Sequence, residues 1–242
     1  LDRFEAAAKS GFKGVEYLFP YPFGKEELAE RVQQHGLTQV LHNLPAGDWG
    51  AGERGIACLP DRIGEFQDGV GQAIKYAGSL GCKQVNCLAG LTPEGVDGDT
   101  VQETLVSTLK FAADALGAAG IRLLIEPINT RDIPGFYLTG TRQALDIIAA
   151  TGSDNIALQY DIYHMQIMEG DLAPTIETNL TRIEHMQLAD NPGRHEPGTG
   201  EINYPFLFDF IDGLGYQGWI GCEYKPAADT VDGLDWVKPY LA

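Results

Sequence analysis

The 242-residue sequence predicts an α/β fold built on a parallel sheet. Segments with the apolar spacing of amphipathic helices alternate with short apolar segments typical of strands, often with a glycine between them. Helices of this length separate successive strands, so the strands cannot pair as hairpins and must pair in parallel through right-handed crossovers. No linker-like segment interrupts the alternation, so residues 1–242 are interpreted as a single domain.

Each predicted helix is followed by a predicted strand, because its amphipathic pattern stops at a breaker and a short apolar run begins. For example, KEELAERVQQH precedes GLTQVLHN, and TVQETLVSTLKFAADALGAA precedes GIRLLIEPIN. In chain order the seven helix and strand pairs are 2–10 and 11–19, 25–35 and 36–43, 61–80 and 81–90, 100–119 and 120–129, 140–150 and 155–164, 171–181 and 182–191, and 204–214 and 215–226.

Seven such strands are one fewer than a (β/α)8 TIM barrel contains. The sequence starts with a helix, LDRFEAAAKSG, so the strand expected to be missing is the first one. An open doubly wound sheet is the alternative, but its Rossmann type carries GxGxxG after a strand, and we find no such motif. We therefore predict a TIM barrel that lacks its first strand.

The composition excludes several classes of partner. Lys and Arg total 17 against 34 Asp and Glu, giving a net charge of −17, which opposes binding to nucleic acid and to anionic membranes. No apolar run is long enough to span a bilayer. The four cysteines (Cys58, Cys82, Cys87 and Cys222) form no CxxC pair, so we expect reduced thiols and a cytoplasmic protein.

Four polar residues lie at the ends of neighbouring predicted strands, where a parallel barrel places its active site. These are Glu126, Asp161, Gln187 and Glu223. Glu126 follows the apolar run LLI, and a buried glutamate is costly unless it is paired or bound to metal. An all-oxygen ligand set favours Mg²⁺ or Mn²⁺. The alternative is that each residue is a separate polar cap; four in consecutive strands favour a metal site.

Two histidines lie near these residues. His42 closes the strand LTQVLHN, and His164 follows Asp161 by three positions. An ordinary core or surface imidazole is the alternative for each, but a place at a strand end favours a functional role. His35 and His185 have no such support.

Two loops rich in turn-forming residues carry arginines. Arg194 and His195 lie in ADNPGRHEPGTG, and the segment NLPAGDWGAGERG after His42 carries Trp49 and Arg54. Loops at the mouth of a barrel commonly bind substrate. The second segment could act as a lid.

Five segments together carry a family resemblance: HNLPAGDWGAGERGIAC, LIEPINTRDIPGFYLTGTRQAL, QYDIYHMQIMEG, ADNPGRHEPGTGEINY and GCEYKP. In this order they resemble the hydroxypyruvate isomerase family of the xylose isomerase-like barrel superfamily. The resemblance covers essentially the whole chain. It implies a divalent metal held by Glu126, Asp161, Gln187 and Glu223, with Glu126 and Glu223 as the acid–base pair.

The resemblance also bears on the substrate. His164 and Arg194 match positions that bind substrate oxygens in the relatives, and Gln187 stands where sugar epimerases have a histidine. The implied reaction interconverts hydroxypyruvate and 2-hydroxy-3-oxopropanoate, a step of glyoxylate metabolism. We expect Arg194 to bind the substrate carboxylate, with Arg54 or Lys225 as reserves, and His42 to contact substrate.

Three other functions remain as alternatives. A ketose 3-epimerase could use the same metal and carboxylates, although Gln187 speaks against it. A DNA-repair phosphodiesterase would need more histidine ligands and a basic face. A barrel that only binds a partner would have no metal at the strand ends. The chain could also form a homo-oligomer.

Overall fold

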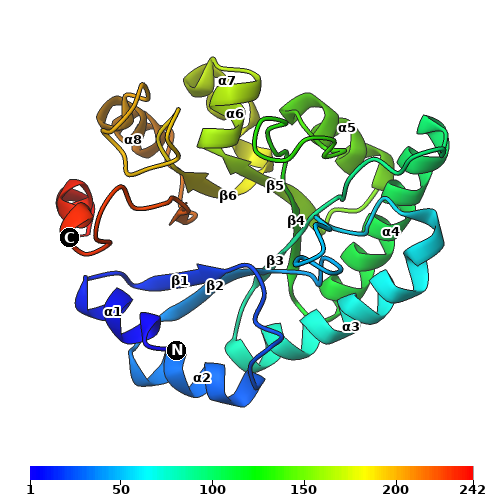
Figure 1. Ribbon diagram of the computed structural model, residues 1–242, viewed down its shortest axis with the longest axis horizontal. Coiled ribbons are helices and arrows are strands. Elements are labelled where there is room, and N and C mark those ends of the chain that lie inside the picture. The colour runs from blue at the N-terminus through cyan, green and yellow to red at the C-terminus, as the bar shows by residue number, and fades with distance from the viewer. Residues whose placement is uncertain (242) are drawn as a thin grey trace.

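The computed structural model describes residues 1–241, and its helices and strands alternate as predicted (Figure 1). The strands are β1 (Gly14–Tyr17), β2 (Thr38–Asn43), β3 (Gln84–Cys87), β4 (Arg122–Ile125), β5 (Ile156–Asp161), β6 (Ile183–Leu188) and β7 (Ile220–Cys222). The α-helices are α1 (Arg3–Lys9), α2 (Lys25–Gln34), α3 (Ile63–Leu80), α4 (Gly98–Ala118), α5 (Thr141–Thr151), α6 (Ile162–Met168), α7 (Leu172–Asn179) and α8 (Tyr204–Gly213). Short 3-10 helices are η1 (Pro60–Arg62), η2 (Leu180–Arg182) and η3 (Asp232–Tyr240).

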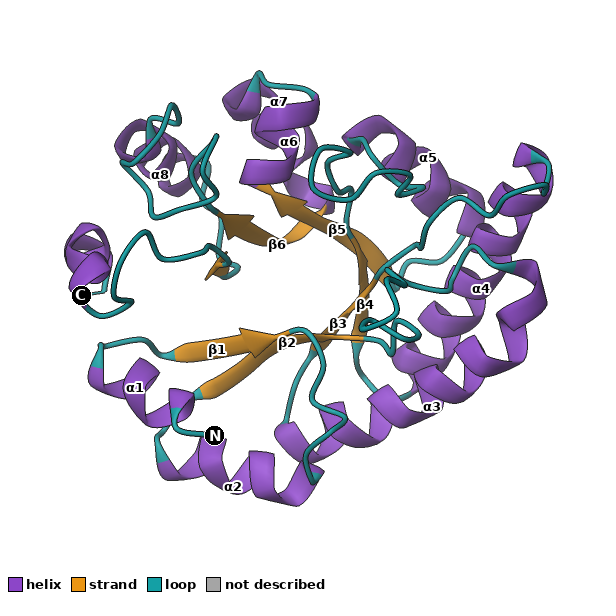
Figure 2. Ribbon diagram, viewed as in Figure 1, coloured by secondary structure: helices purple, strands orange, loops and turns teal. Residues whose placement is uncertain are grey.

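The seven strands form one parallel sheet in the order β1 to β7. The sheet curves around a central space, and the helices lie on its outer side (Figure 2). The predicted TIM-barrel architecture is confirmed. Within residues 1–241, β1 and β7 are the two edges of the sheet and share no ladder of hydrogen bonds. A cavity of about 750 Å³ lies between these edges and is lined by both strands.

The main core lies between the sheet and the surrounding helices. Helix α4 shows how the sequence builds it: Leu105, Leu109 and Leu116 lie at helical spacing, and all three are completely buried. Burial of each such side chain contributes roughly 1.5–3 kcal/mol. The helix begins where the Asp97 side chain accepts a hydrogen bond from the backbone N–H of Thr100, a cap that stabilises a helix by about 1 kcal/mol.

The inner face of the sheet changes from apolar to polar toward the carboxyl ends of the strands. Leu124 and Ala157 belong to a small separate cluster of buried apolar side chains. Side chains of a strand alternate between its two faces, so Glu126, two residues after Leu124, points the same way as Leu124. Asp161, four residues after Ala157, likewise shares its face. The polar end of the barrel interior is therefore where the candidate site lies.

The structure corrects one predicted boundary. The apolar segment 155–164 was expected to be a strand throughout, but β5 ends at Asp161 and α6 begins directly after it. The Asp161 side chain accepts hydrogen bonds from the backbone N–H groups of Tyr163 (2.8 Å) and His164 (3.1 Å), which starts the helix. His164 therefore lies in the first turn of α6 and not at a strand end.

Candidate active site

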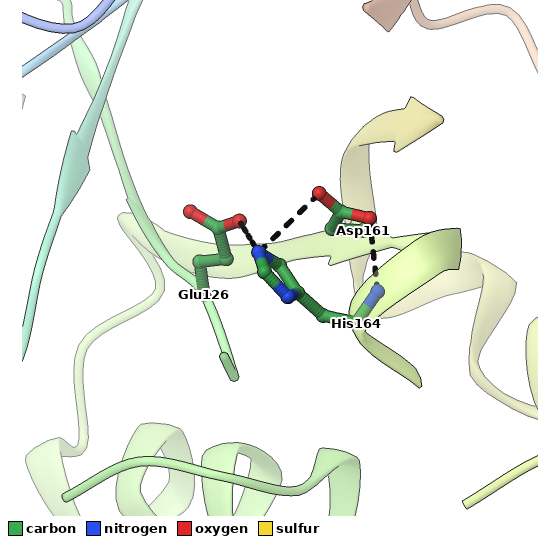
Figure 3. A group of neighbouring side chains, drawn as sticks. All are labelled: Glu126, Asp161 and His164. Carbon is green, nitrogen blue, oxygen red and sulfur yellow. Dashed lines mark hydrogen bonds and ion pairs between the residues drawn. The ribbon is translucent and has the colours of Figure 1, made fainter. Parts of the chain in front are cut away.

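Glu126, Asp161 and His164 form a compact buried group (Figure 3). One ligand atom from each lies within 4.8 Å of the others. His164 Nε2 is 3.9 Å from Glu126 Oε1 and 3.7 Å from Asp161 Oδ2. Two residues of the predicted metal set, Glu126 and Asp161, are thus neighbours, and His164 lies against both.

The charges in this group oppose one another. Burial raises the pKa of Glu126 well above its usual value, and the carboxylates of Glu223 and Asp161 raise it further. Asn86 donates a hydrogen bond to Glu126 Oε2 (2.9 Å), which acts in the other direction. Asp161 Oδ2 is buried and has no hydrogen-bond partner. A buried carboxylate oxygen without a donor, beside two more carboxylates, fits a site for a hard divalent cation.

Glu223 follows β7 and is held differently from Glu126. Its Oε1 lies 3.2 Å from Arg194 Nη2, and its side chain is 36% exposed against 6% for Glu126. Burial raises the pKa of Glu223, and Arg194 acts against that rise. Because Glu223 is more exposed and has a cationic partner, its charged form is stabilised more than that of Glu126.

Gln187 lies on β6 directly beside Asp161 in the sheet register. Its Nε2 donates to Glu16 Oε1 (2.7 Å), and its Oε1 accepts a hydrogen bond from Gln159 Nε2. Both ends of this amide are therefore fixed by other side chains of the barrel interior.

His164 has its ring orientation set by Asn129. Asn129 Oδ1 accepts from the backbone N–H of Asp132 (2.7 Å), so its Nδ2 is the atom that faces His164 Nδ1 at 2.6 Å. The backbone N–H of Asn129 also points at Nδ1 (3.4 Å). Burial lowers the pKa of His164 and favours the neutral ring. Since Nδ1 accepts, the proton is on Nε2, and this N–H faces Glu126 and Asp161. This tautomer suits a hydrogen-bond donor better than a metal ligand.

Arg194 lies in the loop after β6 and points into the site. Its Nη1 and Nη2 each lie 3.2 Å from a carboxylate, of Asp132 and Glu223 respectively. Its guanidinium lies 5.1 Å from the centre of the Tyr163 ring, and the Tyr163 hydroxyl donates to Asp132 (3.0 Å). The backbone N–H of Lys225 donates to the carbonyl of Arg194 (2.8 Å), so Lys225 supports the loop through its main chain.

The Asp190 carboxylate holds this loop from within. It accepts hydrogen bonds from the backbone N–H groups of Gly198 (2.8 Å), Gly200 (2.9 Å) and Ile202 (3.1 Å). Arg194 itself has a φ of 55°, a conformation that non-glycine residues seldom adopt. The position of its guanidinium is therefore set by the folded loop.

His42 and Arg54 have different surroundings. His42 is completely buried; its Nδ1 lies 3.1 Å from the Asn43 carbonyl, and its Nε2 has no partner. Burial lowers the pKa of His42 to about 4. Arg54 lies over the Trp49 ring at 4.2 Å and donates to the carbonyls of Trp49 and Glu53. Its guanidinium is used within its own loop, whereas His42 keeps a free acceptor.

Several polar residues of the site were not predicted from the sequence: Glu16, Asn86, Asn129, Asp132, Gln159 and His185. Two kinds of signal could have identified some of them. Glu16 and Asn86 are polar residues inside short apolar strands. Gln159 and His185 each precede a predicted site residue by two positions, and two positions along a strand share a face.

Comparisons with known proteins agree with this geometry. Residues 4–240 match the family model described as "Xylose isomerase-like TIM barrel". The chain is 56% identical to hydroxypyruvate isomerase from Escherichia coli over 99% of this chain and 93% of the relative. It is 49% identical to 2-oxo-tetronate isomerase from Cupriavidus necator over 100% of this chain and 93% of the relative.

A solved structure has nearly the same backbone. The crystal structure titled "AP endonuclease, family 2" from Brucella melitensis superimposes with a TM-score of 0.96 at 46% identity, covering 99% of this chain and 92% of that one. Among residues 1–241, none of the helices combines the length and apolar composition needed to cross a bilayer. The family match and the high identity over almost the full length establish that the chain belongs to the xylose isomerase-like TIM barrel family.

Proposed function

We propose that this chain is a hydroxypyruvate isomerase, which interconverts hydroxypyruvate and 2-hydroxy-3-oxopropanoate, and that residues 1–242 form one catalytic domain. The observation that carries the proposal is the buried group of Glu126, Asp161 and His164 at the end of the barrel that Arg194 faces. Two carboxylates that hold their protons differently suit proton transfer next to a carbonyl. The guanidinium suits an acidic substrate.

The proposed metal ligands are Glu126, Asp161, Gln187 and Glu223. The unpartnered Asp161 Oδ2 and the mutual repulsion of the carboxylates support this set. A bound Mg²⁺ or Mn²⁺ would supply positive charge that stabilises the enediolate formed when a proton leaves the substrate carbon.

The two glutamates share the proton transfers. Glu223, which its arginine partner keeps ionised more readily, removes a proton from C3 of hydroxypyruvate and returns it to C2. Glu126, whose pKa burial raises, carries the hydroxyl proton from O3 to O2. The sum of these transfers is the aldehyde isomer, with no atom gained or lost.

The remaining residues bind and orient the substrate. Arg194 binds the carboxylate, and His164 donates its Nε2 proton to a substrate oxygen. The free Nε2 of buried His42 accepts from a substrate hydroxyl. Arg54 and Lys225 are reserve cations for the carboxylate. We place the reaction in cytoplasmic glyoxylate metabolism, on the basis of the substrate.

The deciding experiment follows hydroxypyruvate by NMR with purified protein, first with EDTA and then with added Mg²⁺ or Mn²⁺. Conversion that the chelator abolishes and metal restores is the expected result. Parallel reactions contain 2-oxo-tetronate, the acid named in the second relative, and a free ketose. Faster turnover of 2-oxo-tetronate would change the substrate, and turnover of the ketose alone would favour a sugar epimerase. An incision assay on abasic DNA tests the endonuclease title, which the net charge of −17 opposes.

A further inference from the structure

Glu16 connects the first strand of the sheet with the last two. It lies on β1, yet its Oε1 accepts a hydrogen bond from Gln187 Nε2 on β6 (2.7 Å), and its Oε2 lies 2.8 Å from His185 Nε2. The same carboxylate packs against Gly221 of β7, where a Cβ would lie only 2.2 Å from Oε1. Glu16 thus reaches across the side of the barrel where β1 and β7 share no ladder.

This contact decides which end of the Gln187 amide is which. An amide has a donor end and an acceptor end of nearly equal shape, so its neighbours determine its orientation. A carboxylate only accepts, and Glu16 therefore holds the NH2 group. Gln159 holds the other end by donating to Gln187 Oε1. With the amide turned over, two oxygens would face each other beside Glu16, and two NH2 groups would face each other beside Gln159.

We propose that Glu16 is a positioning residue that orients Gln187 so that Oε1, the atom able to bind a cation, faces the carboxylate group. A carbonyl oxygen has two lone pairs, so Oε1 can accept from Gln159 and still bind a metal ion. Such supporting hydrogen bonds orient metal ligands and raise metal affinity. The inference rests on the proposed function, because it assumes that Gln187 is a ligand.

The alternative is that Glu16 only stabilises the fold, as the acidic partner of buried His185. Two variants separate the two roles. Glu16→Leu removes the acceptor at similar volume, whereas Glu16→Gln removes the charge but keeps a carbonyl that can accept from Gln187. Glu184→Leu is the matched control, because Glu184 is an exposed glutamate on the same strand as Gln187.

The experiment measures the Kd for Mn²⁺ of metal-free protein by the electron paramagnetic resonance signal of free Mn²⁺, with circular dichroism as a check on folding. Removing a hydrogen-bond partner of a metal ligand typically weakens binding 10- to 100-fold, so we expect a loss of about that size for Glu16→Leu. Glu16→Gln and Glu184→Leu should stay within about 3-fold of the wild type.

Each result has a defined meaning. A folded Glu16→Leu protein with unchanged Kd overturns the inference, as does a Glu16→Gln protein that loses as much affinity as Glu16→Leu. If Glu16→Leu does not fold, Glu16→Asp replaces it, since its shorter side chain keeps the charge but moves the carboxylate away from Gln187. Full affinity in that variant would likewise overturn the inference. Wild-type protein that binds no Mn²⁺ refutes the metal site itself, a failure of the proposed function.

Discussion

Substitution of Arg194 by alanine should raise the KM for hydroxypyruvate. The guanidinium has five N–H donors, and the folded site uses two of its nitrogens for Asp132 and Glu223, each at 3.2 Å. The remaining donors can meet the substrate carboxylate. A hydrogen bond between charged groups contributes about 1.5–3 kcal/mol, and each 1.4 kcal/mol corresponds to a factor of ten. The KM should therefore rise about 10- to 150-fold.

Steady-state kinetics on three variants test this expectation. Arg194→Lys keeps the positive charge but loses the planar fork, so its KM should lie between those of the wild type and Arg194→Ala. Arg142→Ala is the control, since Arg142 is an exposed arginine on α5 paired only with Asp146 (3.0 Å). The reasoning fails if Arg194→Ala leaves KM unchanged, or if Arg142→Ala raises it as much.

Three further predictions concern the buried carboxylates and His42. Glu126→Gln and Glu223→Gln should each lower kcat at least ~10²-fold with an unchanged circular dichroism spectrum; near-full turnover would remove that glutamate from the reaction. Mn²⁺ at about 100 times its Kd should stabilise metal-free protein by ~2.7 kcal/mol and raise Tm by roughly 5–10 °C, whereas Asp161→Ala should show no such rise. His42 has a folded pKa of about 4 against 6.5 for the free side chain, so the unfolded chain binds the proton first as pH falls. Its contribution to stability is full above pH 6.5 and is lost between 6.5 and 4, by roughly 3 kcal/mol. Urea unfolding across this range should therefore show a smaller acid loss in His42→Phe, and equal losses would contradict the assigned burial effect.

The order of helices and strands could be predicted from the sequence because each strand is a short apolar run between amphipathic helices. The approach of Glu126 to Asp161 could also be anticipated, since both end neighbouring strands of a parallel sheet. The start of α6 could not be, because the pattern of residues 155–164 fits a strand and only the capping hydrogen bonds of Asp161 end it.

The network around Gln187 was also beyond the sequence. Glu16 and Gln187 are 171 positions apart, and nothing local to either residue indicates the other. Their contact exists only because the sheet curves until its two edges face each other. The tautomer of His164 has a similar origin, because it depends on a side-chain amide whose own orientation is set by a third residue, Asp132.

The two oxygens of Asp161 have separate tasks. Oδ1 caps α6, the helix that carries His164, and Oδ2 alone is free. This residue can therefore offer a cation one oxygen only, as long as α6 starts where it does. A change at Asp161 alters a charge and the start of a helix at once, whereas asparagine would keep the capping oxygen and lose only the charge. Evolution of a new substrate preference in this scaffold would accordingly be easier through the loops that hold Arg194 and Arg54 than through Asp161.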